Sequence, residues 1–153
     1  MQAPRRRNAG FTLIEIMAVV LIIGLLSTLV GVAIFGQVDE ARVKTARVQI
    51  SQLESALEFY RLDNGRYPTT EQGLRALVER PAIAPEPRRW RPEGYLKGGA
   101  VPLDPWDEPY QYLQPGENNP YTFDLWSLGA DNQLGGDGVD AEIGNWAQPG
   151  FEG

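Results

Sequence analysis

Cysteine and histidine are both absent from the 153 residues of this chain. Without cysteine it forms no disulfide, and without either residue it has no Cys/His zinc site and no histidine-dependent catalytic triad. Basic residues are missing from the carboxyl-terminal third, because no lysine or arginine follows Lys97, whereas ten aspartates and glutamates do. We therefore expect this part of the chain not to bind nucleic acid and to favour divalent cations as partners.

One long apolar run follows a basic leader. Three arginines at positions 5–7 precede Gly10, and the run from Phe11 to Phe35 is 25 residues long, with Glu15 as its only charge. As a helix it would span about 37 Å, enough to cross a hydrocarbon core of about 30 Å. A secretory signal peptide would have a shorter apolar core with a small-residue cleavage site after it, whereas a plain signal anchor fits the length.

Glu15 does not fit a plain anchor. A carboxylate near the centre of a membrane helix costs roughly 2.5–3.5 kcal/mol by insertion scales, so its place five residues after Gly10 suggests a partner cation. Cleavage after Gly10 would create such a cation, the free amine of Phe11, and opposite charges attract strongly in a low dielectric.

The segment Gly10-Phe11-Thr12-Leu13-Ile14-Glu15 resembles the processing site of the type IV pilin and pseudopilin superfamily. The resemblance implies that a prepilin peptidase cleaves between Gly10 and Phe11 and that Phe11 is then N-methylated. It also implies that Glu15 neutralises the Phe11 amine of a neighbouring subunit. Residues 1–10 are then a cleaved basic leader, residues 11–36 a transmembrane and filament-core helix, and residues 37–153 a periplasmic head.

An amphipathic pattern extends the helix beyond the apolar run. Apolar residues recur at spacings of 4, 3, 4 and 3, the pattern of one helix face: Ala46, Ile50, Leu53, Leu57 and Tyr60. This face is expected to pack against the head. The pattern predicts a helix from Phe11 to about Leu62, ended by a left-handed cap at Asn64-Gly65.

The rest of the head is expected to hold little regular structure. Thr70 can cap a short helix with Glu71 in its first turn, and the many prolines of residues 81–109 predict a pinned loop. Tyr110 to Leu113 and Tyr121 to Ser127 predict an antiparallel hairpin in which Tyr121, Phe123 and Leu125 alternate with the water-facing Thr122, Asp124 and Trp126. The fold class is therefore α+β, a long helix packed on a small antiparallel sheet. Trp90, Trp106, Trp126 and Trp146 are expected to pack this small head or its subunit contacts.

Three further blocks are similar to the major pseudopilin family of type II secretion (GspG type): Leu62 to Leu74, Pro102 to Tyr110, and Ser127 to Asp131. Asp107 departs from the family pattern, in which glycine is common. The resemblance implies a structural subunit without an active site, which forms a homopolymer at the inner membrane of a Gram-negative bacterium. The periplasmic filament would drive folded exoproteins through an outer-membrane channel. Its implied partners are minor pseudopilins, the inner-membrane assembly platform, the prepilin peptidase/N-methyltransferase, and the membrane before assembly.

Residues 128–143 form the chemically richest stretch, a glycine-rich loop with four carboxylates. Calcium requires six to eight oxygen ligands, which carboxylates and backbone carbonyls supply. The spacing fails the EF-hand pattern, because Gln133 and Gly135 stand where acidic ligands belong and flanking helices are missing. On composition alone a solvated acidic turn is as good an interpretation.

The GspG resemblance favours calcium, because these pseudopilins bind one calcium ion in this loop. Asp131 matches the family aspartate after Ser-Leu-Gly-Ala and is the first expected ligand, followed by Asp140 and then Asp137. Leu128 and Val139 would offer backbone carbonyls. A role for Glu142 stays open.

Two other functional classes compete with the secretion pseudopilin. A surface type IV pilin, or a minor pseudopilin of a surface fibre, is disfavoured by the missing cysteines and the acidic loop. A membrane-anchored hydrolase is disfavoured by the lack of histidine, cysteine and a nucleophile elbow, and no catalytic residue is expected.

Overall fold

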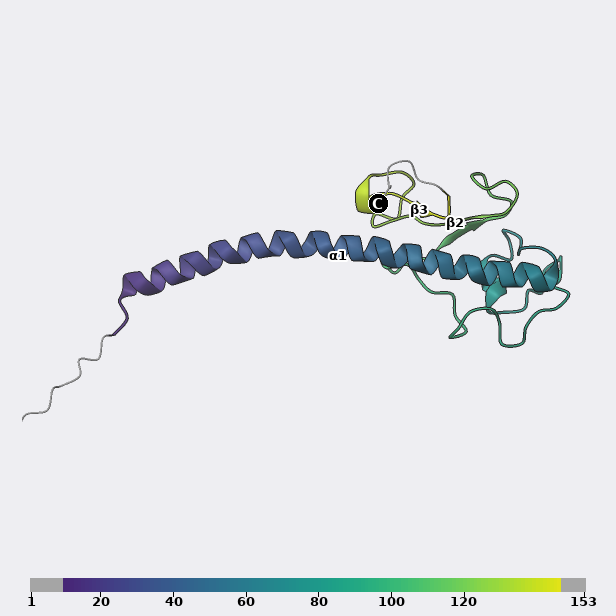
Figure 1. Cartoon of the computed structure of the whole chain (residues 1–153), viewed down its shortest axis with the longest axis horizontal. Coiled ribbons are helices and arrows are strands. Elements are labelled where there is room, and N and C mark those ends of the chain that lie inside the picture. The colour runs from purple at the N-terminus through teal and green to yellow at the C-terminus, as the bar shows by residue number, and fades with distance from the viewer. Residues whose placement is uncertain (1–9, 147–153) are drawn as a thin grey trace, which may run out of the picture. The chain divides into compact units, whose positions relative to one another are not determined.

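The computed structural model describes residues 10–146, and within them the side chains of residues 28–36 are not described. The chain divides into two compact units, Met1–Val38 and Asp39–Gly153. Figure 1 shows the long helix and the small sheet. The elements in chain order are α1 (Leu13–Asn64), η1 (Leu74–Leu77), β1 (Gln111–Leu113), β2 (Asp124–Ser127), η2 (Gly138–Asp140) and β3 (Ile143–Gly144).

The helix α1 begins and ends close to the predicted residues. Gly65, directly after its last residue, has φ of 78°, and its N–H donates to the Arg61 carbonyl at 2.7 Å. Glycine enters this left-handed conformation without the Cβ clash of other residues. The predicted left-handed end of the helix is therefore confirmed.

One face of α1 forms a large part of the head's core. The five residues singled out by their spacing are at most 3% exposed: Ala46, Ile50, Leu53, Leu57 and Tyr60. They form one cluster with residues that follow the helix, including Leu77, Phe123, Leu125 and Ile143. Burying one leucine of this kind contributes roughly 1.5–3 kcal/mol, so this face holds the helix on the sheet.

The sheet has three antiparallel strands in the order β1-β2-β3. The predicted hairpin is present, with Tyr112 opposite Leu125. The strand β3 was not expected, and it pairs Ile143 with Ser127 and Gly144 with Trp126. The resulting fold is α+β, a long helix packed on a small antiparallel sheet, as predicted.

The predicted alternation along β2 is wrong at two residues. Tyr121 precedes the strand and is 99% exposed, whereas Asp124 is 2% exposed. The Asp124 carboxylate is buried because it accepts hydrogen bonds from the N–H groups of Glu117, Asn118 and Asn119 at 2.8–2.9 Å. The side-chain amides of both asparagines add one hydrogen bond each, at 3.0 Å.

The predicted helix cap at Thr70 is also wrong, because the short helix that follows, η1, has Gly73 as its N-cap and no side-chain cap. Thr69 Oγ1 accepts from the Gln72 N–H at 3.2 Å, and Gln72 Oε1 accepts from the Thr69 N–H at 3.1 Å, which is the reciprocal pattern of a capping box. Thr70 instead bridges to the hairpin, because its hydroxyl donates to the Gln114 carbonyl at 3.1 Å and accepts from the Gln114 N–H at 2.9 Å.

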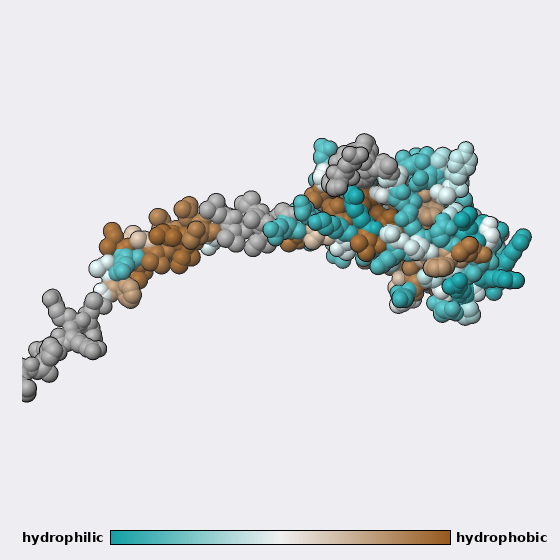
Figure 2. Space-filling model, viewed as in Figure 1, coloured by the Kyte–Doolittle hydropathy of each residue, from teal (hydrophilic) through white to brown (hydrophobic). Residues whose placement is uncertain are grey.

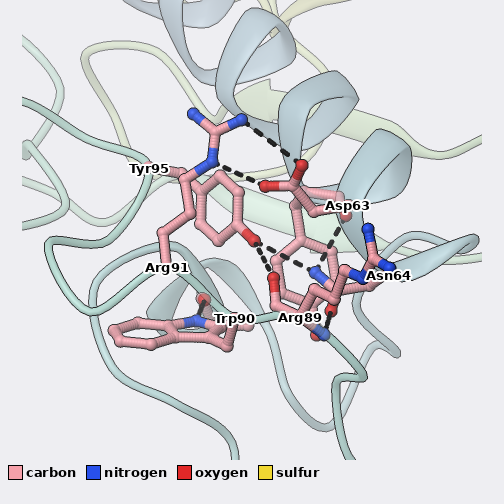
Figure 3. A network of polar contacts seen from close by, with 8 residues as sticks. Asp63, Asn64, Arg89, Trp90, Arg91 and Tyr95 are labelled. Carbon is pink, nitrogen blue, oxygen red and sulfur yellow. Dashed lines mark hydrogen bonds and ion pairs between the residues drawn. The ribbon is translucent and has the colours of Figure 1, made fainter.

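The proline-rich loop is pinned to the end of α1, as Figure 3 shows. Asn64 is 3% exposed, and its side chain donates to Tyr95 Oη at 3.1 Å and accepts from the Arg89 N–H at 2.9 Å. Arg91 forms an ion pair with Asp63 at 2.6 Å, and its hydrogen bond holds the pKa of Asp63 below its ordinary value. These contacts fix a segment that forms no helix or strand of its own.

The tryptophans pack as expected where contacts are described. Trp90 Nε1 donates to the Ala76 carbonyl at 2.9 Å, which ties the proline-rich loop to η1. Trp126 of β2 and Trp146 lie edge to face, with ring centroids 5.9 Å apart.

Candidate assembly and metal-binding sites

The predicted processing site lies at the start of the described chain. Gly10 and Phe11 are exposed and precede the first residue of α1, and Phe11 is 79% exposed. The three arginines at positions 5–7 lie outside the described residues. An exposed dipeptide before a helix is accessible to a peptidase.

Glu15 lies in the first turn of α1 and contacts Thr12. The Glu15 N–H donates to Thr12 Oγ1 at 3.3 Å, and Glu15 Oε2 accepts from the Thr12 N–H at 3.5 Å. These two hydrogen bonds form a loose capping box, a role for Thr12 that our sequence reasoning missed although the Thr-x-x-Glu pattern signals it. Within one chain, the Glu15 carboxylate therefore accepts a hydrogen bond from a backbone N–H at the N-terminus of the helix.

Apolar side chains surround the first turns of α1. Every described residue from 11 to 27 is exposed, and the large hydrophobic ones reach 80% at Leu13 and 75% at Leu21. Figure 2 shows their apolar surface on this part of the helix. Where side chains are described, no stretch of helix is both long and apolar enough to cross a membrane. The predicted transmembrane segment, residues 11–36, includes nine side chains that lie outside the described ones.

The predicted metal loop connects β2 to β3. Its base is closed by the pairing of Ser127 with Ile143, and its two limbs are joined by a hydrogen bond from the Ala130 N–H to the Val139 carbonyl at 2.9 Å. Gly129 has φ of 80°, and a Cβ there would lie 2.8 Å from the Val139 oxygen. The two limbs therefore approach closely at a position that only glycine can fill.

The acidic side chains of this loop do not converge on one point. Asp131 is exposed and accepts from the Gln133 N–H at 3.0 Å, while Glu142 accepts from the Gly135 N–H at 2.8 Å. Asp137 directly precedes η2, and Asp140 is the last residue of η2. Within residues 10–146, no group of three or more acidic side chains is placed to hold a metal ion. The described geometry brings the Val139 carbonyl beside Gly129 but does not gather the predicted carboxylates.

The donor chemistry of the loop nevertheless suits calcium. The side chains that could bind a cation offer oxygen atoms, and a backbone carbonyl approaches closely at Gly136, where a Cβ would lie 2.7 Å from the Asp140 carbonyl oxygen. The Val139 carbonyl accepts one hydrogen bond and keeps a second lone pair for a ligand. Calcium accepts irregular sets of oxygen ligands, so oxygens of this kind fit that ion.

A buried pair at the loop's base was not expected from the sequence. Asp104 is 4% exposed and Ser127 fully buried, and the Ser127 hydroxyl donates to Asp104 Oδ2. Both residues lie within the blocks that resemble the pseudopilin family. Nothing in the sequence shows that they meet, because 23 positions separate them.

The comparisons with known proteins agree with this architecture. A family model described as type II secretion system protein G matches residues 33–146, and one for the prokaryotic N-terminal methylation motif matches residues 5–31. The chain is 51% identical over 142 residues to the type II secretion system core protein G of Pseudomonas aeruginosa, covering 93% of this chain and 97% of that protein. It is 49% identical over 141 residues to the same core protein of Vibrio cholerae, covering 92% of this chain and 93% of that protein.

A solved structure is similar as well. The crystal structure of the major pseudopilin from the type 2 secretion system of enterohaemorrhagic Escherichia coli matches with a TM-score of 0.63 and 45% sequence identity. The match covers 73% of this chain and 92% of that one.

Proposed function

Because the chain belongs to the type II secretion system protein G family and is a major pseudopilin, we propose that its filament drives folded proteins through an outer-membrane channel. It is a structural protein and not an enzyme. Its family implies assembly into a pseudopilus, and its N-methylation motif implies an inner-membrane and periplasmic location.

The exposed apolar surface of α1 is the observation that supports polymerisation most strongly. A helix that is apolar on all sides is buried in lipid or against other protein. In each copy of the chain, residues 11–27 are exposed and mostly apolar. In the proposal, residues 11–36 hold the single-pass subunit in the inner membrane before assembly and lie in the filament core afterwards, with the head in the periplasm.

The secretion role is tested by deleting the gene. Secretion of folded exoproteins should stop while any surface fibres persist, because the filament is proposed to act inside the envelope with minor pseudopilins and the inner-membrane assembly platform. Loss of surface fibres with normal secretion would instead favour a surface type IV pilin.

Processing forms the second part of the proposal. The prepilin peptidase/N-methyltransferase cleaves between Gly10 and Phe11 and methylates the new amine of Phe11. The supporting observations are the matched methylation motif and the exposed dipeptide before α1. Mass spectrometry of the mature protein should show N-methylated Phe11 at the amino terminus, and an intact leader would contradict the proposal.

Glu15 is proposed to pair with the Phe11 amine of the neighbouring subunit. Two substitutions separate this role from the contact with Thr12. Glu15→Gln keeps a carbonyl oxygen that can accept the Thr12 N–H but removes the charge, whereas Glu15→Ala removes both. If the ion pair matters, both variants lose filaments in a cross-linking or electron-microscopy assay, while the exposed control Glu71→Gln assembles normally. Normal assembly of Glu15→Gln would show that only the capping contact is needed.

Calcium binding by loop 128–143 completes the proposal. Asp131, Asp140 and Asp137 would supply carboxylates, and Leu128 and Val139 backbone carbonyls. The support is the oxygen chemistry of the acidic side chains, together with two glycines, Gly129 and Gly136, that the Val139 and Asp140 carbonyl oxygens approach closely. Bound calcium would hold the two limbs of a loop that no disulfide closes.

A melting experiment on the full chain in mild detergent tests the metal. Calcium at 100 times its Kd should stabilise the head by about 2.7 kcal/mol, because it binds the folded form alone. EDTA should remove this gain, and Asp131→Asn should lose most of it, while the exposed control Glu117→Gln keeps it. An unchanged melting temperature on chelation would rule calcium out.

A further inference from the structure

The carboxylate of Asp104 is fully engaged inside the head. Its Oδ1 accepts from the Trp106 N–H at 2.9 Å and from the Glu108 N–H at 3.0 Å. Its Oδ2 accepts from the hydroxyl of Ser127. A buried carboxylate with all these donors is fixed in orientation, so it holds the Ser127 hydroxyl in one rotamer.

The Ser127 oxygen in turn fixes the first peptide of the metal loop. Ser127 Oγ accepts from the Gly129 N–H at 3.2 Å, in a buried contact. That N–H belongs to the same planar peptide unit as the carbonyl of Leu128. Because a trans peptide places its N–H and C=O on opposite sides, the direction of one sets the direction of the other.

The place of Gly129 also sets the spacing of the loop's two limbs. A Cβ at this residue would lie 2.8 Å from the Val139 oxygen and 2.9 Å from the Ala141 oxygen. The next residue, Ala130, donates its N–H to the Val139 carbonyl at 2.9 Å. A rotation of the Leu128–Gly129 peptide would therefore disturb the Leu128 and Val139 carbonyls together.

We infer that the Asp104–Ser127 pair is a positioning element that aims the Leu128 carbonyl and so sets the calcium affinity of loop 128–143. The inference rests on the calcium binding proposed above. Neither side chain is proposed as a ligand, because both are buried and the Asp104 carboxylate already accepts three hydrogen bonds within the head. Outer residues that orient metal ligands in this way change metal affinity by about 10–100-fold when they are removed.

Ser127→Ala tests the inference most directly, because it removes the hydroxyl and leaves the two backbone hydrogen bonds of Asp104 intact. Its matched control is Ser55→Ala, which deletes an exposed hydroxyl of α1 that donates to its own helix at 2.9 Å. Calcium affinity is measured by isothermal titration of the full chain in mild detergent. We expect the Kd of Ser127→Ala to rise about tenfold or more, and that of Ser55→Ala to stay at the parent value.

Amide hydrogen exchange provides a readout that does not require the ion. In EDTA, the segment around Gly129 should exchange faster in Ser127→Ala than in the parent, while α1 keeps its protection. Asp104→Asn is a second variant of nearly equal volume. Its amide oxygen can keep the Trp106 and Glu108 N–H groups, and its NH₂ group then faces the Ser127 hydroxyl, which loses its acceptor. This variant should also raise the Kd for calcium, and it provides the test if Ser127→Ala does not fold.

The outcomes separate this inference from the proposal on which it rests. A parent chain that binds no calcium would overturn both. Calcium binding by the parent with an unchanged Kd in Ser127→Ala, or an equal loss in Ser55→Ala, would overturn the positioning role alone.

Discussion

Asp107 shows how a departure from a family pattern is accommodated at a single residue. Its φ is 67°, in the left-handed region where residues other than glycine are strained. Its N–H donates to the Asp104 carbonyl at 3.0 Å, within the turn that holds the Asp104 carboxylate. Aspartate is among the few residues that tolerate this conformation, because its short polar side chain can bond locally.

The effect of a substitution at Asp107 on stability should therefore depend on how readily the new residue adopts a positive φ. Asp107→Gly is expected to change the free energy of unfolding by less than about 1 kcal/mol, because relief of strain offsets the extra freedom of the unfolded chain. Asp107→Val should cost about 1–2 kcal/mol, since a β-branched residue resists the left-handed region. Denaturant unfolding compares the two, and equal stability of Val and Gly at this position would contradict the explanation.

Gly116 is needed for a different reason, the close approach of the Asp124 carboxylate. A Cβ at this position would lie 2.5 Å from Asp124 Oδ1 and 2.7 Å from the Asp124 backbone nitrogen. Gly116→Ala should therefore displace the hairpin loop and destabilise the head by about 1–3 kcal/mol. The control is Glu117→Ala, which keeps the N–H that Asp124 accepts. A melting temperature unchanged by Gly116→Ala would show that the loop yields without cost.

At the scale of elements, the turn around Gln72 joins η1 to the proline-rich loop. Gln72 is 6% exposed, and its side-chain amide donates to the Ile83 and Pro85 carbonyls, both at 3.0 Å. A glutamate would place a carboxylate oxygen against these two carbonyls.

Gln72→Glu should therefore destabilise the head by about 1–3 kcal/mol, the cost of leaving buried polar groups without partners. The adjacent Glu71→Gln makes the reverse exchange at an exposed position and should be neutral. Chemical denaturation of both variants measures the difference. Effects of equal size and opposite sign would mean that net charge, rather than these hydrogen bonds, sets the stability.

The elements that could be predicted from the sequence are those in which residues recur at a regular spacing or are bounded by turn residues. The core face of α1 has a spacing of 3 and 4, and the hairpin is bounded by prolines and glycine, so both were found. The strand β3 has two residues and no period. The burial of Asp124 depends on N–H donors five to seven residues away, which no alternation pattern reveals.

The candidate sites likewise differ in how far the sequence alone predicts them. The processing site is contiguous, so its residues could be named from the sequence. The Asp104–Ser127 pair could not, because only the folded sheet brings the two residues together. The cap of the turn before η1 was misplaced because Thr69 and Thr70 are adjacent and equally able to accept a backbone N–H.

At the scale of the whole head, acid should be destabilising. Burial raises the pKa of Asp124, but the hydrogen bonds from Asn118, Asn119 and Glu117 outweigh it, and the net pKa lies below the ordinary value of 3.8. A carboxyl with a lowered folded pKa adds stability above its unfolded pKa and loses that contribution as the pH falls through the folded one.

The free energy of unfolding should therefore fall as the pH drops below about 3.8. Asp124→Asn should be less stable at neutral pH and should lose less stability on acidification. Thermal melts of both chains between pH 7 and pH 2.5, with EDTA present to exclude calcium effects, provide the comparison. Parallel pH profiles for the two chains would assign acid sensitivity to other carboxylates.

The edge-to-face pair of Trp126 and Trp146 gives the molecule a built-in optical probe. Trp126 lies in β2, two residues before loop 128–143 begins, and Trp146 follows β3, where the loop has ended. Indole emission responds to the polarity and geometry around the ring. Closing or opening of the loop can therefore be followed in the unlabelled protein by ultraviolet fluorescence, during metal titration and during assembly alike.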